Sequence, residues 1–245
     1  MSLNILVDTI FVGQWIGSLA IAAVSVVLPF TFLISSLGMA IGIGGSSIIS
    51  RALGAKEPEK AEITFGNQIT MTLILALVSV SIGYFFSDEV LVLFGANGSI
   101  LQPAREFYFP VLLGVPFLAL CMTGNTVIRA EGKPKFAMYA MLIPAFGNLI
   151  LDIVFIKVLD YGIFGAALAT SISYFLCFLF ILWFFIAKSE IRISTAHLVL
   201  KGKTVREISS LGFYEHYHLV RRHITWFSAN PKTTWIRMYI RRNTF

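Results

Sequence analysis

Charged residues are scarce in this chain, making up 13% of its 245 residues against about 25% in an ordinary soluble domain. With 57% hydrophobic residues and a mean hydropathy of +0.80, this scarcity argues against a soluble globular protein. Cysteine is rarer still. Cys121 and Cys177 both lie in apolar stretches and are expected to pack rather than to form a disulfide or metal site. No membrane-embedded nucleophile and base pair is present, so we do not expect an enzyme.

Long uncharged stretches indicate where the chain crosses the bilayer. They cover 9–50, 63–87, 107–128, 136–151 and 161–187. A transmembrane helix needs about 20 apolar residues, so the first stretch is too long for one helix, and Gly13, Gly17 and Ser18 predict a turn within it. The sequence therefore predicts an all-α polytopic membrane protein with six helices, the first of them short. We expect these helices near 1–16, 19–49, 62–86, 104–129, 136–158 and 162–187.

Lysine and arginine between these segments predict the orientation in the membrane. Eleven of them fall in or beside the connections 51–61, 130–135 and 188–210, whereas the opposite connections hold only Arg105 and Lys157. We therefore expect the three basic connections in the cytoplasm. The N-terminus is expected on the same side, in a multi-pass protein of the cell membrane.

The composition changes abruptly near Phe213. The last 33 residues carry six Lys and Arg and one acid, and their longest uncharged stretch, 223–231, is too short to span a bilayer. Three units are expected: a six-helix transmembrane bundle over 1–187, a cytoplasmic linker over 188–212, and a basic aromatic tail over 213–245.

The tail has two interpretations. It is either an interfacial segment, with its arginines facing lipid phosphates, or the frame-shifted end of a longer gene. We favour the second, because the tail lacks the regular apolar face that surface binding requires. Basic residues alone do not indicate nucleic acid, so no nucleic-acid partner is expected.

Acidic residues within the predicted helices are the strongest candidates for function. Asp8 and Asp152 each cost free energy in a membrane and are expected to face a partner or a wet cavity. Asn148 precedes Asp152 by four residues, which places both side chains on one helix face, where they could bind the same ion or proton. A hydrogen-bonded packing pair is the alternative.

The small residues between 38 and 47 are better explained by helix packing than by ligand binding. Glycine and serine crowd residues 38–47, but the strand and lysine of a phosphate-binding loop are absent. These small residues predict close contact between helices in lipid.

Several short motifs, in order along the chain, resemble the multidrug and toxic compound extrusion (MATE) family. They are Val7-Asp8-Thr9-Ile10-Phe11-Val12-Gly13, Ser50-Arg51-Ala52-Leu53-Gly54, Arg129-Ala130-Glu131-Gly132-Lys133-Pro134-Lys135, Asn148-Leu149-Ile150-Leu151-Asp152 and Gly165-Ala166-Ala167-Leu168-Ala169-Thr170. The resemblance runs from about residue 3 to residue 212.

This resemblance implies one lobe of a two-lobe, twelve-helix exporter that exchanges sodium or protons for organic, often cationic, drug-like compounds. No cofactor is implied besides the coupling ion. By motif position, the family's ion-coupling residues fall on Asp8, Asn125, Asn148, Asp152 and Thr170. The aromatic residue often found near this site has no clear match, although Phe107 or Tyr108 lies in the right region.

Two features depart from the family pattern. The first helix has only about half a span before Gly13, and the apolar seventh helix is replaced by the tail. We therefore expect an incomplete, non-transporting fragment that needs a second lobe or a second copy. A relative of lipid-linked sugar flippases is an alternative, disfavoured because no Lys or Arg lies inside a span to neutralise a pyrophosphate. A membrane assembly subunit without transport activity is the other.

Overall fold

The structure is a computed structural model that describes the backbone of residues 2–191 and 195–229, with the side chains of 9–191, 197–214 and 217. Within these residues the chain is helical and has no strand. The elements are α1 (Ser2–Trp15), α2 (Ser18–Gly54), α3 (Pro58–Phe85), α4 (Ser87–Leu93), α5 (Gly98–Ala130), α6 (Pro134–Asp152), the π-helix η1 (Ile153–Val158), α7 (Gly162–Ala187), the 3-10 helix η2 (Thr195–Leu198) and α8 (Gly202–Ala229).

Five of these segments are long and apolar enough to cross a membrane: α2, α3, α5, α6 continued by η1, and α7. With the short α1, they correspond to the six predicted segments, so the predicted all-α membrane fold is confirmed. The turn between the first two lies at Gly17, whose φ of 119° favours glycine. The short helix α4 was not predicted, because seven residues are too few for a periodic pattern to stand out.

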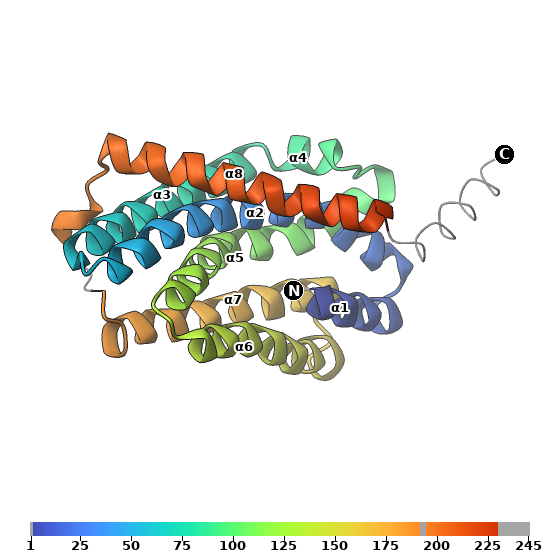
Figure 1. Cartoon of the computed structure of the whole chain (residues 1–245). Coiled ribbons are helices and arrows are strands. Elements are labelled where there is room, and N and C mark those ends of the chain that lie inside the picture. The colour runs from blue at the N-terminus through green and yellow to red at the C-terminus, as the bar shows by residue number, and fades with distance from the viewer. Residues whose placement is uncertain (1, 192–194, 230–245) are drawn as a thin grey trace.

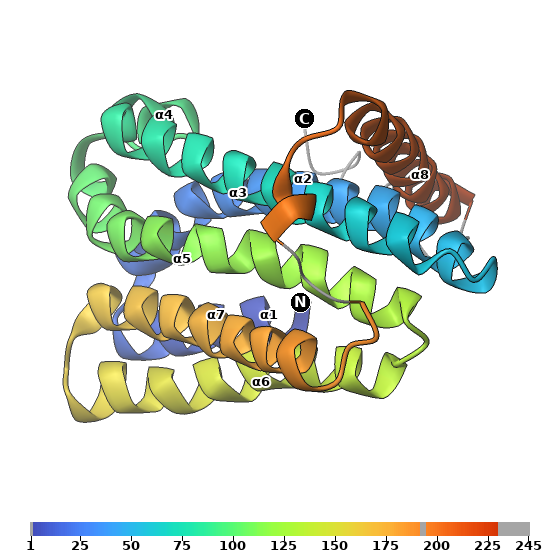
Figure 2. The ribbon, with the colours of Figure 1, turned by 90° about the vertical axis from the view of Figure 1, so that its left-hand side faces the viewer.

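Helix α5 lies at the centre of the bundle and packs against α2, α3, α6 and α7 (Figures 1 and 2). The first core cluster joins α1, α2, α4 and α5 with the start of α7, and the second joins α5, α6 and α7 with the end of α2, the start of α3 and Ile191. Figure 2 shows α5 between one layer that contains α2 and α3 and another that contains α6 and α7. This central position allows α5 to contribute to any site between the two layers.

Two glycines of α2 lie so close to neighbouring helices that a larger side chain would not fit between them. A Cβ atom on Gly42 would lie 2.7 Å from Oγ1 of Thr126, and one on Gly45 would lie 2.4 Å from Cδ of Gln68. The close approach lets Nε2 of Gln68 donate to the carbonyl oxygens of Ile41 and Gly42 at 3.1 and 2.9 Å. The prediction that this cluster serves helix packing is confirmed.

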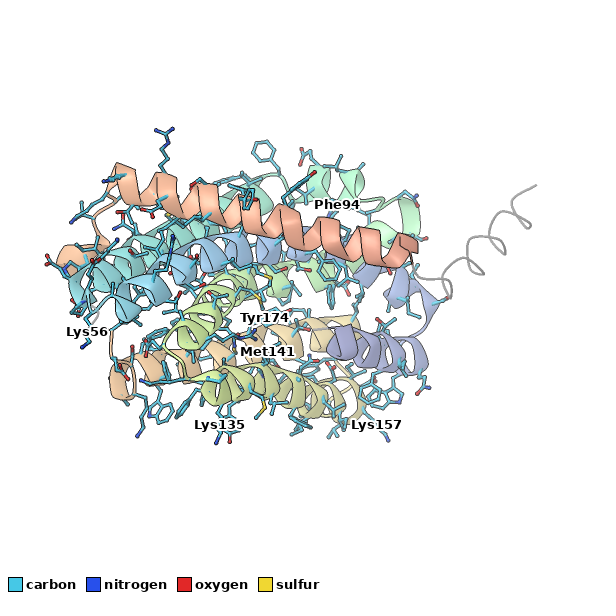
Figure 3. The ribbon with its side chains drawn as sticks, in the orientation of Figure 1. Lys56, Phe94, Lys135, Met141, Lys157 and Tyr174 are labelled. Carbon is cyan, nitrogen blue, oxygen red and sulfur yellow. The ribbon has the colours of Figure 1, made fainter. Side chains whose placement is uncertain are left out.

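The connections rich in lysine lie at one end of the bundle. Figure 3 shows Lys56 and Lys135 toward that end and Lys157 toward the other. Two contacts fasten this end, because Nζ of Lys133 donates to the carbonyl oxygen of Lys188 at 2.6 Å and the Ser189 hydroxyl donates to the carboxylate of Glu131. Which end faces the cytoplasm remains a prediction.

Helix α8 runs past Phe213, where the composition changes, and ends at Ala229. The backbone therefore has no break at the predicted boundary between linker and tail. Helix α8 lies along α2 (Figure 1), and it is not among the membrane-spanning candidates. Residues 230–245 of the predicted tail lie outside the described part of the chain.

Candidate functional site

A cavity of about 300 Å³ opens between α5, α6 and α7, with walls completed by α1 and α2. Its lining is mostly apolar, and five helices each contribute at least one polar side chain. These are Thr9 of α1, Thr31 of α2, Asn125 of α5, Asp152 of α6 and Thr170 of α7. Figure 3 labels two further lining residues, Met141 of α6 and Tyr174 of α7, in the middle of the bundle. The cavity thus brings together three of the five predicted coupling residues.

Asp152 is the last residue of α6 and is 1% exposed, as is Asn148 one turn before it. The spacing of four residues places both on one face of the helix, as predicted. A carboxylate at this depth is costly unless it is compensated. Asp152 belongs to the lining of the cavity, and its two carboxylate oxygens are buried.

Thr170 joins this pair from α7. Nδ2 of Asn148 donates to Oγ1 of Thr170 at 3.5 Å, and that hydroxyl donates in turn to the carbonyl oxygen of Ala166 at 3.0 Å. The Asn148 amide nitrogen therefore points to Thr170. The first of these contacts joins α6 to α7, and the second lies within α7.

Asn125 lies elsewhere on the wall. Its Nδ2 donates to the carbonyl oxygen of Ala137 at 2.7 Å, a bond that ties α5 to the first turns of α6. Asn125 and Asp152 line the same cavity from different helices. The structure thus gives Asn125 a packing contact in addition to its place on the wall.

The side chain of Asp8 lies outside the described residues, although the backbone there belongs to α1. The next residue, Thr9, lines the cavity. Helix α1 packs against α2, α6, α7 and η1, and Nζ of Lys157 lies 5.6 Å from the ring centroid of Trp15. The backbone near Asp8 therefore runs along the cavity wall.

A π-helix follows Asp152 directly, which the sequence analysis missed. In η1 the backbone nitrogen of Leu159 donates to the carbonyl oxygen of Val154, five residues earlier, at 2.9 Å. Gly165 makes room for this wider turn, since a Cβ atom there would lie 3.0 Å from the Phe155 carbonyl oxygen. Segments of π-helix occur often at functional sites. No residue pattern in this stretch distinguishes a π-helix from the α-helix that was expected.

The two aromatic candidates separate. Phe107 lines the cavity, whereas Tyr108 lies away from it, fully buried, and donates from its hydroxyl to the carbonyl oxygen of Gly83 at 3.1 Å. Of the two candidates, Phe107 is therefore the one at the cavity, where Phe32 and Tyr174 are further aromatic lining residues.

Among the described residues that line the cavity, Asp152 is the only acid and Arg129 the only base. Arg129 reaches the cavity from the last turn of α5, and its Nη2 donates to Sδ of Met141 at 3.2 Å. Arg129 lies in the last turn of α5, so the expectation that no Lys or Arg lies inside a span to neutralise a pyrophosphate stays a prediction. One guanidinium supplies a single positive charge, which is too little to neutralise the negative charges of a pyrophosphate.

Comparisons with known proteins agree with this arrangement. The MatE family matches residues 1–154. The chain is 33% identical over 204 residues to the multidrug export protein MepA of Staphylococcus saprophyticus, covering 83% of this chain and 45% of that protein. It is 31% identical over 209 residues to the probable multidrug resistance protein YoeA of Bacillus subtilis, covering 84% of this chain and 44% of that protein. The chain spans about half the length of the curated relatives it matches.

Solved structures give the same result. A MATE protein in its bent conformation superimposes with a TM-score of 0.83 at 28% identity, over 92% of this chain and 50% of that one. Inward-facing and outward-facing conformations of a multidrug resistance MATE family transporter give TM-scores of 0.80 and 0.81, both at 28% identity. The inward-facing match covers 86% of this chain and 48% of that one, and the outward-facing match covers 92% and 50%.

Proposed function

The chain belongs to the MatE family. We propose that it forms one lobe of an exporter that moves organic, drug-like compounds out of the cell in exchange for sodium ions or protons that move in. The relatives that support this proposal include a multidrug export protein and a multidrug resistance MATE family transporter, and these names describe transport rather than catalysis. The observation that carries the proposal is the placement of Asp152 and Thr170, with Asn148 behind them, at the wall of one cavity within the membrane-spanning bundle.

The coupling ion is bound by oxygen atoms of Asp152, Asn148 and Thr170, with Asp8 and Asn125 as the further predicted members. Carboxylate, amide and hydroxyl oxygens are hard ligands that suit sodium. A carboxylate can also take up a proton. Sodium and protons therefore compete for one site in this proposal.

The cavity suits a compound with an apolar body and a positive charge. Its walls are largely apolar, as in typical small-molecule sites, and Asp152 supplies a negative charge. Protonation of Asp152 or binding of sodium removes that charge, which weakens the hold on an organic cation. Ion and drug thus exclude one another, as an exchanger requires.

Transport further requires a second lobe or a second copy of the chain. Alternating access in secondary transporters arises when one bundle rocks against another around a central site. The similar TM-scores to the inward-facing and outward-facing structures support a lobe that keeps its shape while it moves.

The site is tested first with the purified chain. Sodium and low pH should each raise the unfolding temperature of the wild-type chain in detergent, since a ligand that binds only the folded state stabilises it. Asp152→Asn should abolish both effects. Asp160→Asn is the matched control, because Asp160 is exposed in the connection between η1 and α7. Equal ion responses in all three proteins would contradict the coupling site.

Export is tested in a two-lobe protein built by joining this chain to the second lobe of a relative. There Asp152→Asn should abolish ion-driven efflux of ethidium while leaving membrane insertion intact, because removing a buried charge does not impair insertion. Normal efflux by this variant at normal expression would return Asn148 and Asp152 to a packing role.

A further inference from the structure

The two cysteines of the chain meet at the junction of three helices. The thiol of Cys121 on α5 donates to the carbonyl oxygen of Tyr174 at 3.6 Å, and that of Cys177 on α7 donates to the carbonyl oxygen of Ala140 on α6 at 3.1 Å. Cys177 follows Tyr174 by three residues and lies on the same face of α7. Both cysteines are 4% exposed, and both line the same cavity.

Five sulfur-containing side chains line the cavity. Both cysteines belong to its wall, together with Met39, Met122 and Met141 from α2, α5 and α6. Met122 follows Cys121 in the sequence, and Met141 follows Ala140, whose carbonyl oxygen accepts from Cys177. Thiol and thioether sulfurs are soft ligands that select soft metal ions, whereas the oxygens of Asp152 and Thr170 are hard ligands.

We infer that Cys121 and Cys177 form a binding site for a soft metal cation that accepts two sulfur ligands, of the mercuric type. No group of three or more His, Cys, Asp and Glu side chains that could hold a metal occurs among the described residues. Zinc takes four ligands in structural sites, so this pair alone does not satisfy it. A thiophilic ion with two-coordinate geometry needs only the two thiolates.

Charge balance favours a divalent ion. Each thiol loses its proton as a metal–sulfur bond forms, so one mercuric ion and two thiols give a neutral dithiolate complex and two protons that pass to the solvent. A neutral complex avoids the cost of leaving a charge in an apolar environment. The site therefore binds without the help of Asp152, and its occupancy does not depend on the proposed export activity.

The packing role expected for the cysteines is compatible with this site. Both belong to the second core cluster and fix α5 and α7 against each other. Their additional position on the cavity wall gives an ion a way to reach them.

The test uses the purified full chain in detergent and mercuric chloride as the probe. One ion per chain should protect both thiols from a maleimide reagent, as measured by mass spectrometry, and should release two protons. Protection of one thiol by one ion, or of two thiols only by two ions, would overturn the inference. This measurement needs no variant and no transport, so it is independent of the outcome of the efflux experiments.

Variants give the second measurement. Cys121→Ser and Cys177→Ser should each weaken mercuric binding about a hundredfold in competition with glutathione. In the wild-type chain, once one thiolate has bound the ion, the other is held nearby at a high effective concentration and forms the second sulfur–mercury bond. Met71→Leu is the matched control, since Met71 lies on α3 and is not among the lining residues. Equal retention of the ion by a single-cysteine variant and by the Met71 variant would overturn the inference.

Discussion

Gly44 of α2 and Gly212 of α8 face each other where the two helices pack together. A Cβ atom on Gly44 would lie 2.1 Å from the carbonyl oxygen of Ile208 and 2.9 Å from the backbone nitrogen of Gly212. A Cβ atom on Gly212 would in turn lie 2.2 Å from the carbonyl oxygen of Ala40. Both contacts involve backbone atoms, so a side chain at either position requires a shift of the whole helix.

Gly44→Ala and Gly212→Ala should therefore each destabilise the protein by about 1–3 kcal/mol, the usual cost of overpacking. Helix propensity alone predicts the opposite sign, because alanine is the better helix former. Thermal unfolding in detergent checks the result. Gly54→Ala is the control, since no atom lies within 4 Å of a Cβ there. The same unfolding temperature in all three variants would show that α8 does not pack tightly on α2.

The membrane-spanning helices could be predicted from the sequence because scarce charges mark their ends. The prediction was less accurate where polar or small residues continue a helix. The charges of Arg51 and Lys60 predict helix ends next to them. In the structure, however, α2 continues past Arg51 to Gly54, and α3 begins at Pro58, before Lys60. Arg51 and Lys60 are exposed in these turns, and a helix can continue past a charged residue whose side chain is solvated.

The candidate site shows the same limit. Asn148 and Asp152 could be placed on one face from their spacing alone, whereas the contact of Asn148 with Thr170 depends on the packing of α6 on α7. Asp8 lies beyond the described side chains and stays a prediction. The π-helix and the place of Arg129 on the cavity wall depend on tertiary contacts, which residue periodicity does not record.

The bond between Asn148 and Thr170 predicts a specific effect of removing the hydroxyl. Thr170→Val leaves Nδ2 of Asn148 without this acceptor and removes one oxygen from the site, so affinity for the coupling ion should fall at least about tenfold, or 1.4 kcal/mol. Thr170→Ser should retain most of the affinity. Sodium-dependent and pH-dependent unfolding temperatures give the measurement. Ser173→Ala serves as the control, because its hydroxyl donates to Ala169 within α7. A Thr170→Val chain that binds like wild type would remove Thr170 from the site.

The predicted orientation can be tested by thiol labelling. In a chain with both native cysteines replaced by serine, Glu59→Cys should be shielded from an impermeant maleimide in intact cells, and Asn97→Cys should react. Both positions are exposed in the structure, so a difference between them reports the side of the membrane rather than burial. Labelling of Glu59→Cys before lysis would reverse the orientation.

The ion pair between α4 and α5 predicts a dependence on pH. Nε of Arg105 donates to Oδ1 of Asp88 at 2.7 Å, and this bond holds the pKa of Asp88 below its ordinary value of 3.8. A depressed pKa in the folded state means that the stabilisation is present above pH 3.8 and is lost as the pH falls through the lower folded value. Both side chains are exposed, so the effect should be small.

Asp88→Asn should accordingly unfold at a slightly lower temperature than wild type near neutral pH, and the difference should disappear in strong acid. Thermal unfolding over a pH series gives the comparison, with Glu106→Gln as a control because the hydrogen bond of Glu106 to Gln102 is exposed and lies within α5. A difference that persists unchanged into strong acid would mean that Asp88 acts through something other than its charge.

The final prediction is that these 245 residues do not transport by themselves. The cavity is formed by α1, α2, α5, α6 and α7, and the structures that it resembles are about twice as long. Rocking of one bundle needs a second bundle to supply the opposite wall. Purified chain in liposomes should therefore move no ethidium when a sodium or proton gradient is applied, while a two-lobe relative reconstituted in parallel should. If two copies can form the missing wall, uptake will appear and grow steeply with the ratio of protein to lipid. Uptake independent of that ratio would show that a single chain is sufficient, and the requirement for a second lobe would be wrong.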